Sequence, residues 1–408
     1  MTAHRGVRSI LALLLLTACG SEVSKDGGST TGTTVPGSTS VTTDVPATSA
    51  APTDSTLPGV WVQPTAAPTL YFTDDRGTTD APLSVVTRLS PDGTITELWS
   101  EMGEVMPRVL DVSPDGTRLL VSRYSYAEGV VGFHLVEREL ATGTETEIAQ
   151  RDQYLVAKYA LDNSGDLFVT NTVDEVDSTG VITKETQSLD RIANDGTEIA
   201  NLVTVESMET LMWQQVMMDG ELAVVIGGAP MTLVGGSGQA MPELPVEGRS
   251  CAAIRQVTDA AVLASCMEPS EEFVYFYQLW LVPLDGSAPQ QVTKVANNGS
   301  GADFGAGDLW TTTNGRQFVQ RYGDCGAAWV EELQADGSSS ASDAAGVILG
   351  VDGTRLITAS SGSCDGTYAT IVAYDTATGT STTYLAPPDA TDDHPYGANA
   401  FDILALVR

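Results

Sequence analysis

Hydrophobic residues beyond Val60 occur in short runs of five to eight, and residues that favour turns separate these runs. No long stretch repeats its apolar residues at the spacing of a helix, three to four positions apart. Short apolar runs bounded by Gly, Pro, Asp, Asn and Ser are typical of β-strands. The pattern therefore predicts an all-β chain.

Two kinds of turn recur between the predicted strands. One is an Asp-Gly turn, as in the segment SPDGT at 113–117, and the other is a Thr-Gly-Thr turn, as in ATGT at 141–144. Pro fixes φ at the first central position, Asp hydrogen-bonds its own backbone, and Gly adopts the positive φ that closes the turn. Each turn folds one strand back on the strand before it.

The Asp-Gly class of turn repeats along the chain with a mean spacing of about 47 residues, at Asp115, Ser164, Asp219, Asp259, Asn314 and Asp352. Four-stranded propeller blades repeat at about 40 to 50 residues. We therefore expect a β-propeller of four-stranded blades, seven in number, with six or eight as the alternatives. Six blades are expected near 108–150, 155–205, 208–247, 249–295, 301–343 and 345–388. A seventh combines 60–99 with a closing strand at 400–406.

The unit from Val112 to Ala149 resembles the repeats of TolB-like propellers, whose blades carry a Ser-Pro-Asp-Gly turn before an apolar strand. The segment from Thr69 to Gly77 resembles the strand of that family that ends in a Ser-Asp-Arg-like loop. The resemblance implies the propeller architecture and no particular activity, because its motif marks a turn. Since TolB has a six-bladed ring, seven blades depart from that family.

The N-terminus carries the features of an export signal. Arg5 and Arg8 precede an apolar run at 10–16, and Leu16-Thr17-Ala18 leads directly to Cys19. This arrangement resembles the bacterial lipoprotein signal peptide, which implies cleavage of residues 1–18 and attachment of lipid, palmitate included, at Cys19. We expect the mature protein at the bacterial cell membrane, anchored by lipid and facing the extracytoplasmic side. An ordinary secretory signal or a buried N-terminal helix is the alternative.

Residues 19–57 form the second predicted region. They are almost entirely Ser, Thr, Gly, Pro, Ala and Asp, and they offer too little apolar surface to offset the entropy of ordering. We expect a disordered linker that joins the lipidated Cys19 to a propeller domain at 58–408.

Charge limits the classes of partner. The chain has 20 Lys and Arg against 53 Asp and Glu, for a formal net charge of −33. Nucleic acid binding requires clustered Lys and Arg on phosphates, so nucleic acid is excluded as a partner. We expect a monomer, with the membrane and a protein or small ligand as partners. Ca²⁺ is the one cofactor that this acidity leaves open.

The chain has five cysteines, and four of them follow Cys19: Cys251, Cys266, Cys325 and Cys364. An even number of cysteines in an exported chain favours disulfides. Of three pairings, we favour the one that joins Cys251 to Cys266 across a hairpin of one blade and Cys325 to Cys364 between adjacent blades. A four-cysteine zinc site is the alternative, although the chain has no CxxC spacing.

Residues for catalysis are scarce in the mature chain. Only His134 and His394 remain after cleavage, and neither lies in a motif. Nucleophilic hydrolysis needs a base beside the nucleophile, and metal or haem redox centres need several ligands. We therefore expect no catalytic residue, no metal ligand and no enzyme.

The connections after the second strand of each blade vary in length, whereas the Asp-Gly turns are uniform. These variable loops are predicted at 74–82, 124–129, 172–184, 227–242, 267–274, 323–327 and 360–367. Variable loops on a rigid scaffold are where binding residues concentrate. The ligand-binding candidates are Asp74, Asp75, Arg76, Glu128, Asp324 and Asp365. We expect a binding or scaffolding lipoprotein that uses one loop face. The alternative is an extracytoplasmic hydrolase or lyase that acts on glycan or peptide.

Overall fold

The computed structural model describes residues 68–78, 81–102, 106–127, 130–151, 155–176, 182–206, 211–269, 275–298, 303–324, 327–361, 368–386 and 401–406. The predicted signal peptide and linker, with Cys19, lie outside these residues. So do Glu128, Cys325, Cys364 and Asp365. For Asp74, Asp75 and Arg76 the structure describes the backbone and not the side chains.

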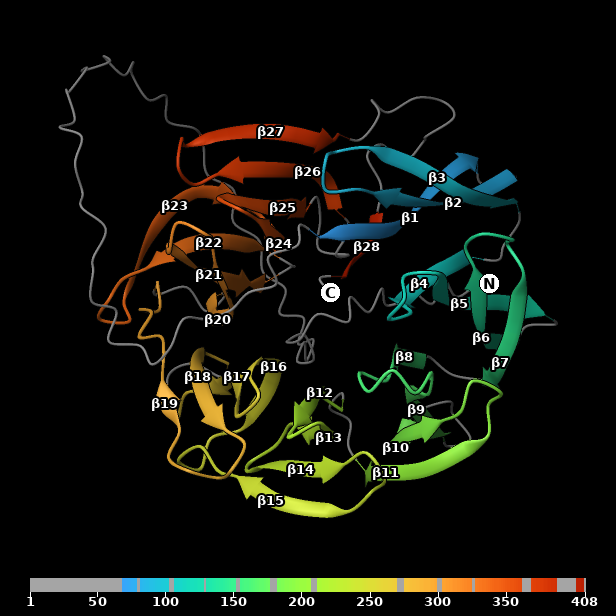
Figure 1. The fold of residues 1–408 in the computed structure, drawn as a ribbon, viewed down its shortest axis with the longest axis horizontal. Helices are drawn as coiled ribbons and strands as arrows, with labels where there is room; N and C mark the ends of the chain where they lie inside the picture. The colour runs from blue at the N-terminus through green and yellow to red at the C-terminus, as the bar shows by residue number, and fades with distance from the viewer. Residues whose placement is uncertain are drawn as a thin grey trace, which may run out of the picture.

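The described residues form twenty-eight strands arranged as a ring around a central axis (Figure 1). Three of the sheets are separate four-stranded blades. Their strands are β4 (Met106–Val112), β5 (Arg118–Ala127), β6 (Val130–Glu139) and β7 (Glu145–Arg151); β8 (Leu155–Tyr159), β9 (Leu167–Val176), β10 (Ile182–Ile192) and β11 (Glu198–Glu206); and β12 (Trp213–Met218), β13 (Glu221–Ile226), β14 (Met231–Gly235) and β15 (Ala240–Leu244).

Two further sheets have eight strands each. One contains β16 (Cys251–Thr258), β17 (Ala261–Met267), β18 (Tyr277–Pro283), β19 (Gln290–Gln291), β20 (Asp303–Thr311), β21 (Gln317–Gly323), β22 (Ala328–Leu333) and β23 (Ser339–Ala345). The other contains β24 (Val347–Asp352), β25 (Arg355–Ser361), β26 (Tyr368–Asp375), β27 (Thr380–Leu385), β28 (Phe401–Leu406), β1 (Thr69–Thr78), β2 (Ala81–Leu89) and β3 (Ile95–Met102).

Each large sheet consists of two four-stranded units joined by a single residue pair. Tyr277 of β18 pairs with Gly305 of β20, and Tyr368 of β26 pairs with Phe401 of β28. When each large sheet is divided at that pair, the described strands form seven four-stranded units (Figure 1). The predicted four-stranded blades are confirmed.

The ring closes by pairing its two ends. Strand β28, from the C-terminal end of the chain, pairs with β1, with Thr69 opposite Leu406 and Asp74 opposite Phe401. Strands β1, β2 and β3 then complete this blade outward from β28. Pairing both ends leaves no unmatched strand at the point of closure, which protects a β-protein from edge-to-edge association.

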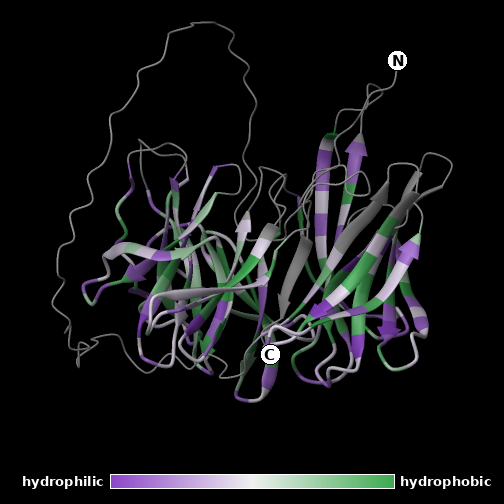
Figure 2. Ribbon diagram, turned by 90° about the horizontal axis from the view of Figure 1, so that it is seen from above, coloured by the Kyte–Doolittle hydropathy of each residue, from purple (hydrophilic) through white to green (hydrophobic). Residues whose placement is uncertain are grey.

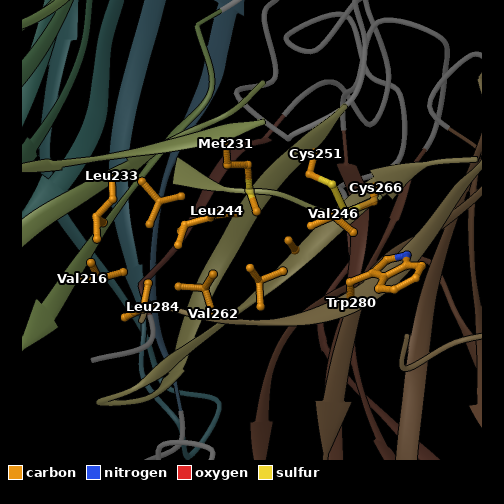
Figure 3. Close-up of a cluster of buried hydrophobic side chains, with 14 of the residues drawn as sticks. Val216, Met231, Leu233, Leu244, Val246, Cys251, Val262, Cys266, Trp280 and Leu284 are labelled. Atoms are coloured by element: carbon orange, nitrogen blue, oxygen red, sulfur yellow. A yellow bond between two sulfur atoms is a disulfide. The ribbon is translucent and has the colours of Figure 1, made fainter. Parts of the chain in front are cut away.

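The core lies between neighbouring blades. One apolar cluster joins the β12–β15 blade to the β16–β19 blade, and it includes Val216, Leu233, Val262, Trp280 and Leu284 (Figure 3). Each large apolar side chain that is fully buried contributes about 1.5–3 kcal/mol. Packing between blades therefore holds the inner strands in place.

Polar side chains also join neighbouring blades through backbone groups. The Asp111 carboxylate of β4 accepts a hydrogen bond from Tyr159 N of β8 at 2.7 Å. The Gln256 amide of β16 both donates to Met217 O at 2.7 Å and accepts from Met217 N at 2.8 Å. These bonds satisfy buried backbone groups that have no strand partner of their own.

The Asp-Gly turns form as predicted. The Asp115 carboxylate accepts hydrogen bonds from the Ser113 hydroxyl at 2.6 Å and the Thr117 hydroxyl at 2.7 Å. Gly116 has a φ of 70°, in the left-handed region that favours glycine. The same local bonding explains why the turns recur at one end of the blades.

These turns give a prediction for acid stability. Hydrogen bonds within the turns lower the pKa of five exposed aspartates: Asp92, Asp115, Asp195, Asp285 and Asp336. A carboxyl whose folded pKa is lowered stabilises the fold above its unfolded pKa, and this stabilisation is lost as the pH falls through the folded pKa. We expect the free energy of unfolding to fall as the pH drops below about 4. Urea unfolding over a pH series measures it. Asp115→Asn should make the acid decline shallower, and a decline parallel to that of the parent would contradict the assignment.

Candidate functional site

The ring has two faces with different connections. The links from second to third strands lie at one end of the blades, which we call the loop face. The Asp-Gly turns lie at the other end, which we call the turn face. Figure 2 shows the ring from its edge, with the strands running between these two faces.

The predicted ligand-binding residues that fall within the described chain lie at the loop face. Asp74, Asp75 and Arg76 are on β1, near its hairpin with β2. Asp324 follows β21 and is exposed. The side chains of Asp74, Asp75 and Arg76 lie outside what the structure describes, so the role of these residues in binding stays a prediction, as it does for Asp324, Glu128 and Asp365.

Three consecutive blades carry unusually long hairpins at the loop face. The pairs β1–β2, β5–β6 and β9–β10 have strands of nine to eleven residues, whereas the equivalent strands of the other four blades have five to eight. At about 3.4 Å per residue, three extra residues lengthen a strand by about 10 Å. We call these three hairpins the ribbons. They form a raised wall along one side of the loop face.

The ribbons correct part of the sequence analysis. Residues 74–82, 124–129 and 172–184 were expected to be loops, but the strand pairing continues to Thr78–Ala81, Ala127–Val130 and Val176–Ile182. Val, Ile and Thr at 172–184 and the two Tyr residues at 124–129 favour strands, and the pairing of one hairpin arm with the other overrides the polar composition. This content of β-branched and aromatic residues was the signal that could have identified these two ribbons.

The β9–β10 ribbon extends beyond both of its neighbouring strands. Strand β8 pairs with β9 only as far as Asn171, and β11 pairs with β10 only from Thr186. Within the described part of the chain, no strand pairs with the outer edge of β9 at 172–176. This ribbon therefore presents a strand edge about 17 Å long.

The side chains of this ribbon are acidic and partly apolar. Val173 is 53% exposed. Asp174 lies directly opposite Glu185, and Glu175 lies opposite Lys184. Burial raises the pKa of Glu185, and the neighbouring charge of Asp174 adds to this rise. Two carboxyl groups in one cross-strand pair repel each other and favour a nearby positive charge.

Charged groups on the innermost strands have unusual surroundings. The Lys158 ammonium of β8 lies 5.3 Å from the centre of the Trp213 ring. Burial lowers the pKa of Lys158, while the charge of Asp111 opposes that change. The face of the Trp213 ring is thus the main neighbour of the Lys158 ammonium. A ring face stabilises a buried cation less than water does.

A second inner group is the ion pair of Arg255 on β16 with Asp308 on β20, at 3.1 Å. Burial lowers the pKa of Arg255 and raises the pKa of Asp308. The guanidinium also lies 4.6 Å from the centre of the Trp310 ring. Because ionisable groups with shifted pKa values are enriched at functional sites, these inner strands are a candidate catalytic region.

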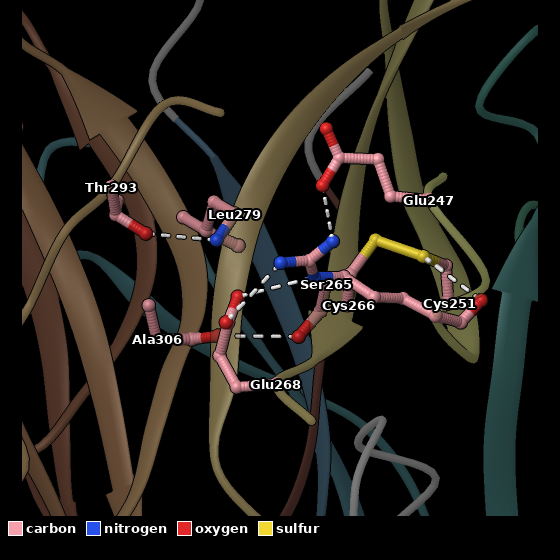
Figure 4. The surroundings of a disulfide bond; sticks show 9 residues. Glu247, Cys251, Ser265, Cys266, Glu268, Leu279, Thr293 and Ala306 are labelled. Carbon is pink, nitrogen blue, oxygen red and sulfur yellow. Dashed lines mark hydrogen bonds and ion pairs between the residues drawn. A yellow bond between two sulfur atoms is a disulfide. The ribbon is translucent and has the colours of Figure 1, made fainter. Parts of the chain in front are cut away.

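The Cys251–Cys266 disulfide forms as predicted, between paired residues of β16 and β17 (Figure 4). Beside it, Arg249 forms ion pairs with Glu247 at 2.6 Å and with Glu268 at 3.4 Å. Cys251 also forms a backbone bridge to Gly228, in the connection between β13 and β14. The disulfide therefore joins β16 to β17 at the loop-face end of this blade, and the backbone bridge joins that end to the neighbouring blade.

A buried ionic network lies in the next blade and was missed by sequence reasoning. The Arg321 guanidinium contacts both carboxylate oxygens of Asp303, at 2.7 and 2.8 Å, and Glu331 at 2.8 Å. It also donates to Ala296 O at 3.2 Å, in the link that precedes β20. The side chains of Arg321 and Asp303 are 2% and 0% exposed. No motif in the sequence distinguishes these two residues from the other charged ones.

Among the residues that the structure describes, no three His, Cys, Asp or Glu side chains are grouped as metal ligands. No helix within the described ranges is long and apolar enough to cross a membrane. The Ca²⁺ alternative and the lipid anchor are untested by either finding.

Comparison with known proteins gives structural matches only. No protein-family model and no curated protein matches the sequence. The chain is similar to an acylaminoacyl peptidase from Pyrococcus horikoshii, with 14% identity, a TM-score of 0.44, and 80% of this chain and 53% of that one covered. It is similar to an oligogalacturonate lyase in complex with manganese, with 13% identity, a TM-score of 0.47, and 84% and 97% covered.

A third similar structure is TolB from Acinetobacter baumannii, with 11% identity, a TM-score of 0.40, and 67% of this chain and 63% of that one covered. The chain spans about half the length of the peptidase. All three likenesses concern the propeller fold alone, because their identities are below 25%.

The comparison corrects one expectation. We expected the chain not to be an enzyme, but the structures similar to it include the peptidase and the lyase. That expectation was wrong because it treated the scarcity of His and of known motifs as sufficient evidence. Carboxylate and ammonium groups with shifted pKa values can also carry acid–base chemistry, and the inner strands contain such groups.

Proposed function

We propose that this chain is a lipid-anchored extracytoplasmic propeller that binds an extended ligand, a segment of protein or of glycan, at its loop face. Lipid at Cys19 holds it at the bacterial membrane, and residues 20–57 join the anchor to the ring. The observation that supports binding at this face is the wall of three ribbons, which among the described strands belong to three consecutive blades. Such a one-sided wall favours a ligand that lies along the face.

The two faces can be compared by blocking each in turn. Thr183→Cys places a thiol on the β9–β10 ribbon, and Thr142→Cys places one in a turn between β6 and β7 at the turn face. Both positions are exposed. Each thiol is coupled to a polyethylene glycol maleimide, and binding to arrays of defined peptides and oligosaccharides is measured. We expect the loop-face adduct to lose binding and the turn-face adduct to keep it. Equal loss or equal retention would contradict the proposal.

The anchor has its own test. Cys19→Ala should remove the mass of the lipid and move the protein from the membrane fraction to the soluble fraction. Mass spectrometry and fractionation measure these two changes. A variant that stays acylated and membrane-bound would contradict the anchor.

A second candidate function is an enzyme that cleaves a glycan or peptide chain as a hydrolase or lyase. The specific support is the group of desolvated charges on the inner strands, Lys158, Arg255 and Asp308. Lys158 is the candidate base, because a lowered pKa favours its neutral form. Asp308 forms an ion pair with Arg255 and would hold this guanidinium in place.

Turnover of the array ligands tests this candidate. We expect Lys158→Met to reduce product formation, measured by mass spectrometry, by at least about tenfold, the lower end of what a positioned acid or base contributes. Lys294→Met is the matched control, because Lys294 is exposed in the link between two blades. Equal activity in the two variants, with both folded, would exclude Lys158 from the reaction.

A further inference from the structure

In the part of the chain that the structure describes, no strand pairs with the outer edge of the β9–β10 ribbon at 172–176, and this edge has a definite chemistry. Residues 172–176 of β9 pair with β10 on one side, while β8 begins at Leu155, opposite Asn171. A β-strand edge of this length carries backbone donors and acceptors that a further strand can satisfy. Strand addition is a common way for proteins to bind an extended peptide.

Charge selects the kind of strand that would fit. Asp174 and Glu175 are consecutive, so their side chains point to opposite faces of the ribbon. An added strand would therefore meet a carboxylate on each of its faces. The Oδ1 atom of Asp174 is buried and accepts no hydrogen bond within the described structure. A basic residue opposite Asp174 would give this atom a partner, and one opposite Glu175 would add to the ion pair that Glu175 forms with Lys184 at 3.7 Å.

The apolar part of the edge adds a second requirement. Val173 is half exposed and lies beside the two acidic residues. A β-branched residue in the added strand would pack on Val173. The complementary segment thus has two consecutive basic residues flanked by apolar ones.

Resting on the proposed function, we propose that the outer edge of β9 at 172–176 binds an extended peptide segment with consecutive Lys or Arg residues by strand addition. A second copy of this chain does not fit. Pairing two such edges would place Asp174 and Glu175 against the same acidic residues, and like charges in a cross-strand pair are destabilising.

Three fluorescent synthetic peptides test this edge. They contain TVKKVT, TVEEVT, and TVKKVT with alternate backbone nitrogens methylated, which keeps the charges and removes donors. Fluorescence anisotropy measures their binding to the intact chain. We expect only the unmodified lysine peptide to bind. Equal binding of the methylated peptide would overturn strand addition in favour of simple charge attraction.

Paired variants locate the site. Asp174→Asn with Glu175→Gln removes two charges from the edge, and Glu198→Gln with Glu221→Gln removes two from exposed positions at the turn face. We expect the edge variant to weaken binding by about tenfold, and the control by less than about twofold, at equal ionic strength. Equal weakening in both variants would overturn the assignment. Urea unfolding confirms that both variants fold.

The result of the peptide test can be distinguished from the result of the test of loop-face binding. If TVKKVT fails to bind while the Thr183→Cys adduct still blocks an array ligand, the strand-addition site is wrong and loop-face binding stands. If that adduct blocks nothing, loop-face binding itself fails.

Discussion

Asp303→Asn is expected to lower the free energy of unfolding by about 3 kcal/mol or more, as measured by urea denaturation. Removing one partner of a buried ion pair leaves the other charge uncompensated, and such losses are about 3–5 kcal/mol. Both carboxylate oxygens of Asp303 contact the Arg321 guanidinium, and neither side chain is more than 2% exposed. Glu331 remains as a partner of Arg321, which is why we expect the lower end of that range.

Two comparisons make this prediction specific. Glu206→Gln removes one partner of the exposed pair with Lys184, where the side chains are 70% and 38% exposed. Exposed pairs contribute at most about 1 kcal/mol, so this control should change little. Asp303→Asn combined with Arg321→Met should recover part of the loss, because it removes the unpaired charge. A single Asp303 variant as stable as the Glu206 control would contradict the assigned role.

The network also bears on the loop face. Asp303 begins the innermost strand β20, and Arg321 lies near the end of β21, just before the link that contains Asp324. Arg321 also contacts Ala296 O in the chain that enters this blade. The buried pair therefore holds together the base of the loop face on the side opposite the ribbons. Loss of the Asp303–Arg321 pair should weaken binding at the loop face because the strand ends that it holds together would shift. The pair itself would not contact the ligand.

Local chemistry explains why the blades could be predicted from sequence. The Ser113-to-Thr117 turn closes through hydrogen bonds to Asp115 and the positive φ of Gly116, all within five residues. Turns of this kind recur once in each repeat, so their spacing defines the blades. The pairing of Cys251 with Cys266 followed because a hairpin places two residues across from each other.

Features that depend on distant parts of the chain could not be predicted in the same way. The ribbons form because one arm of a hairpin pairs with the other beyond the neighbouring strands, and the polar residues near Asp174 resemble a loop in sequence. The aromatic neighbour of the Lys158 ammonium is Trp213, in the next blade. Arg321 and Asp303 are 18 residues apart, and only the folded sheet brings them together. In each case the neighbour that matters comes from another strand.

Differences between the two halves of the ring connect fold and function. In the proposed function the blades with ribbons would face the ligand, while the blades with the disulfide and the buried Arg321 network have short hairpins. A ligand that lies along the ribbons would therefore meet a rigid opposite side. This arrangement favours recognition of an extended chain over enclosure of a small molecule.

Cys251→Ala with Cys266→Ala is expected to lower the free energy of unfolding by about 3 kcal/mol, because the disulfide closes a segment of 15 residues in the unfolded chain. Urea denaturation under oxidising conditions measures the loss. A change of less than about 1 kcal/mol would contradict a stabilising role, since buried cysteines replaced by alanine lose packing as well.

Reduction distinguishes this disulfide from the one predicted between Cys325 and Cys364. A reducing agent should destabilise the parent, because it opens the Cys251–Cys266 bond. The substituted chain has no such bond left to open. If the reducing agent lowers the stability of that variant further, a second disulfide is present. The parent would then lose both disulfides on reduction. If the stability of the substituted chain does not change on reduction, the predicted Cys325–Cys364 pairing is wrong. The stabilising disulfide of this ring is then the one between Cys251 and Cys266.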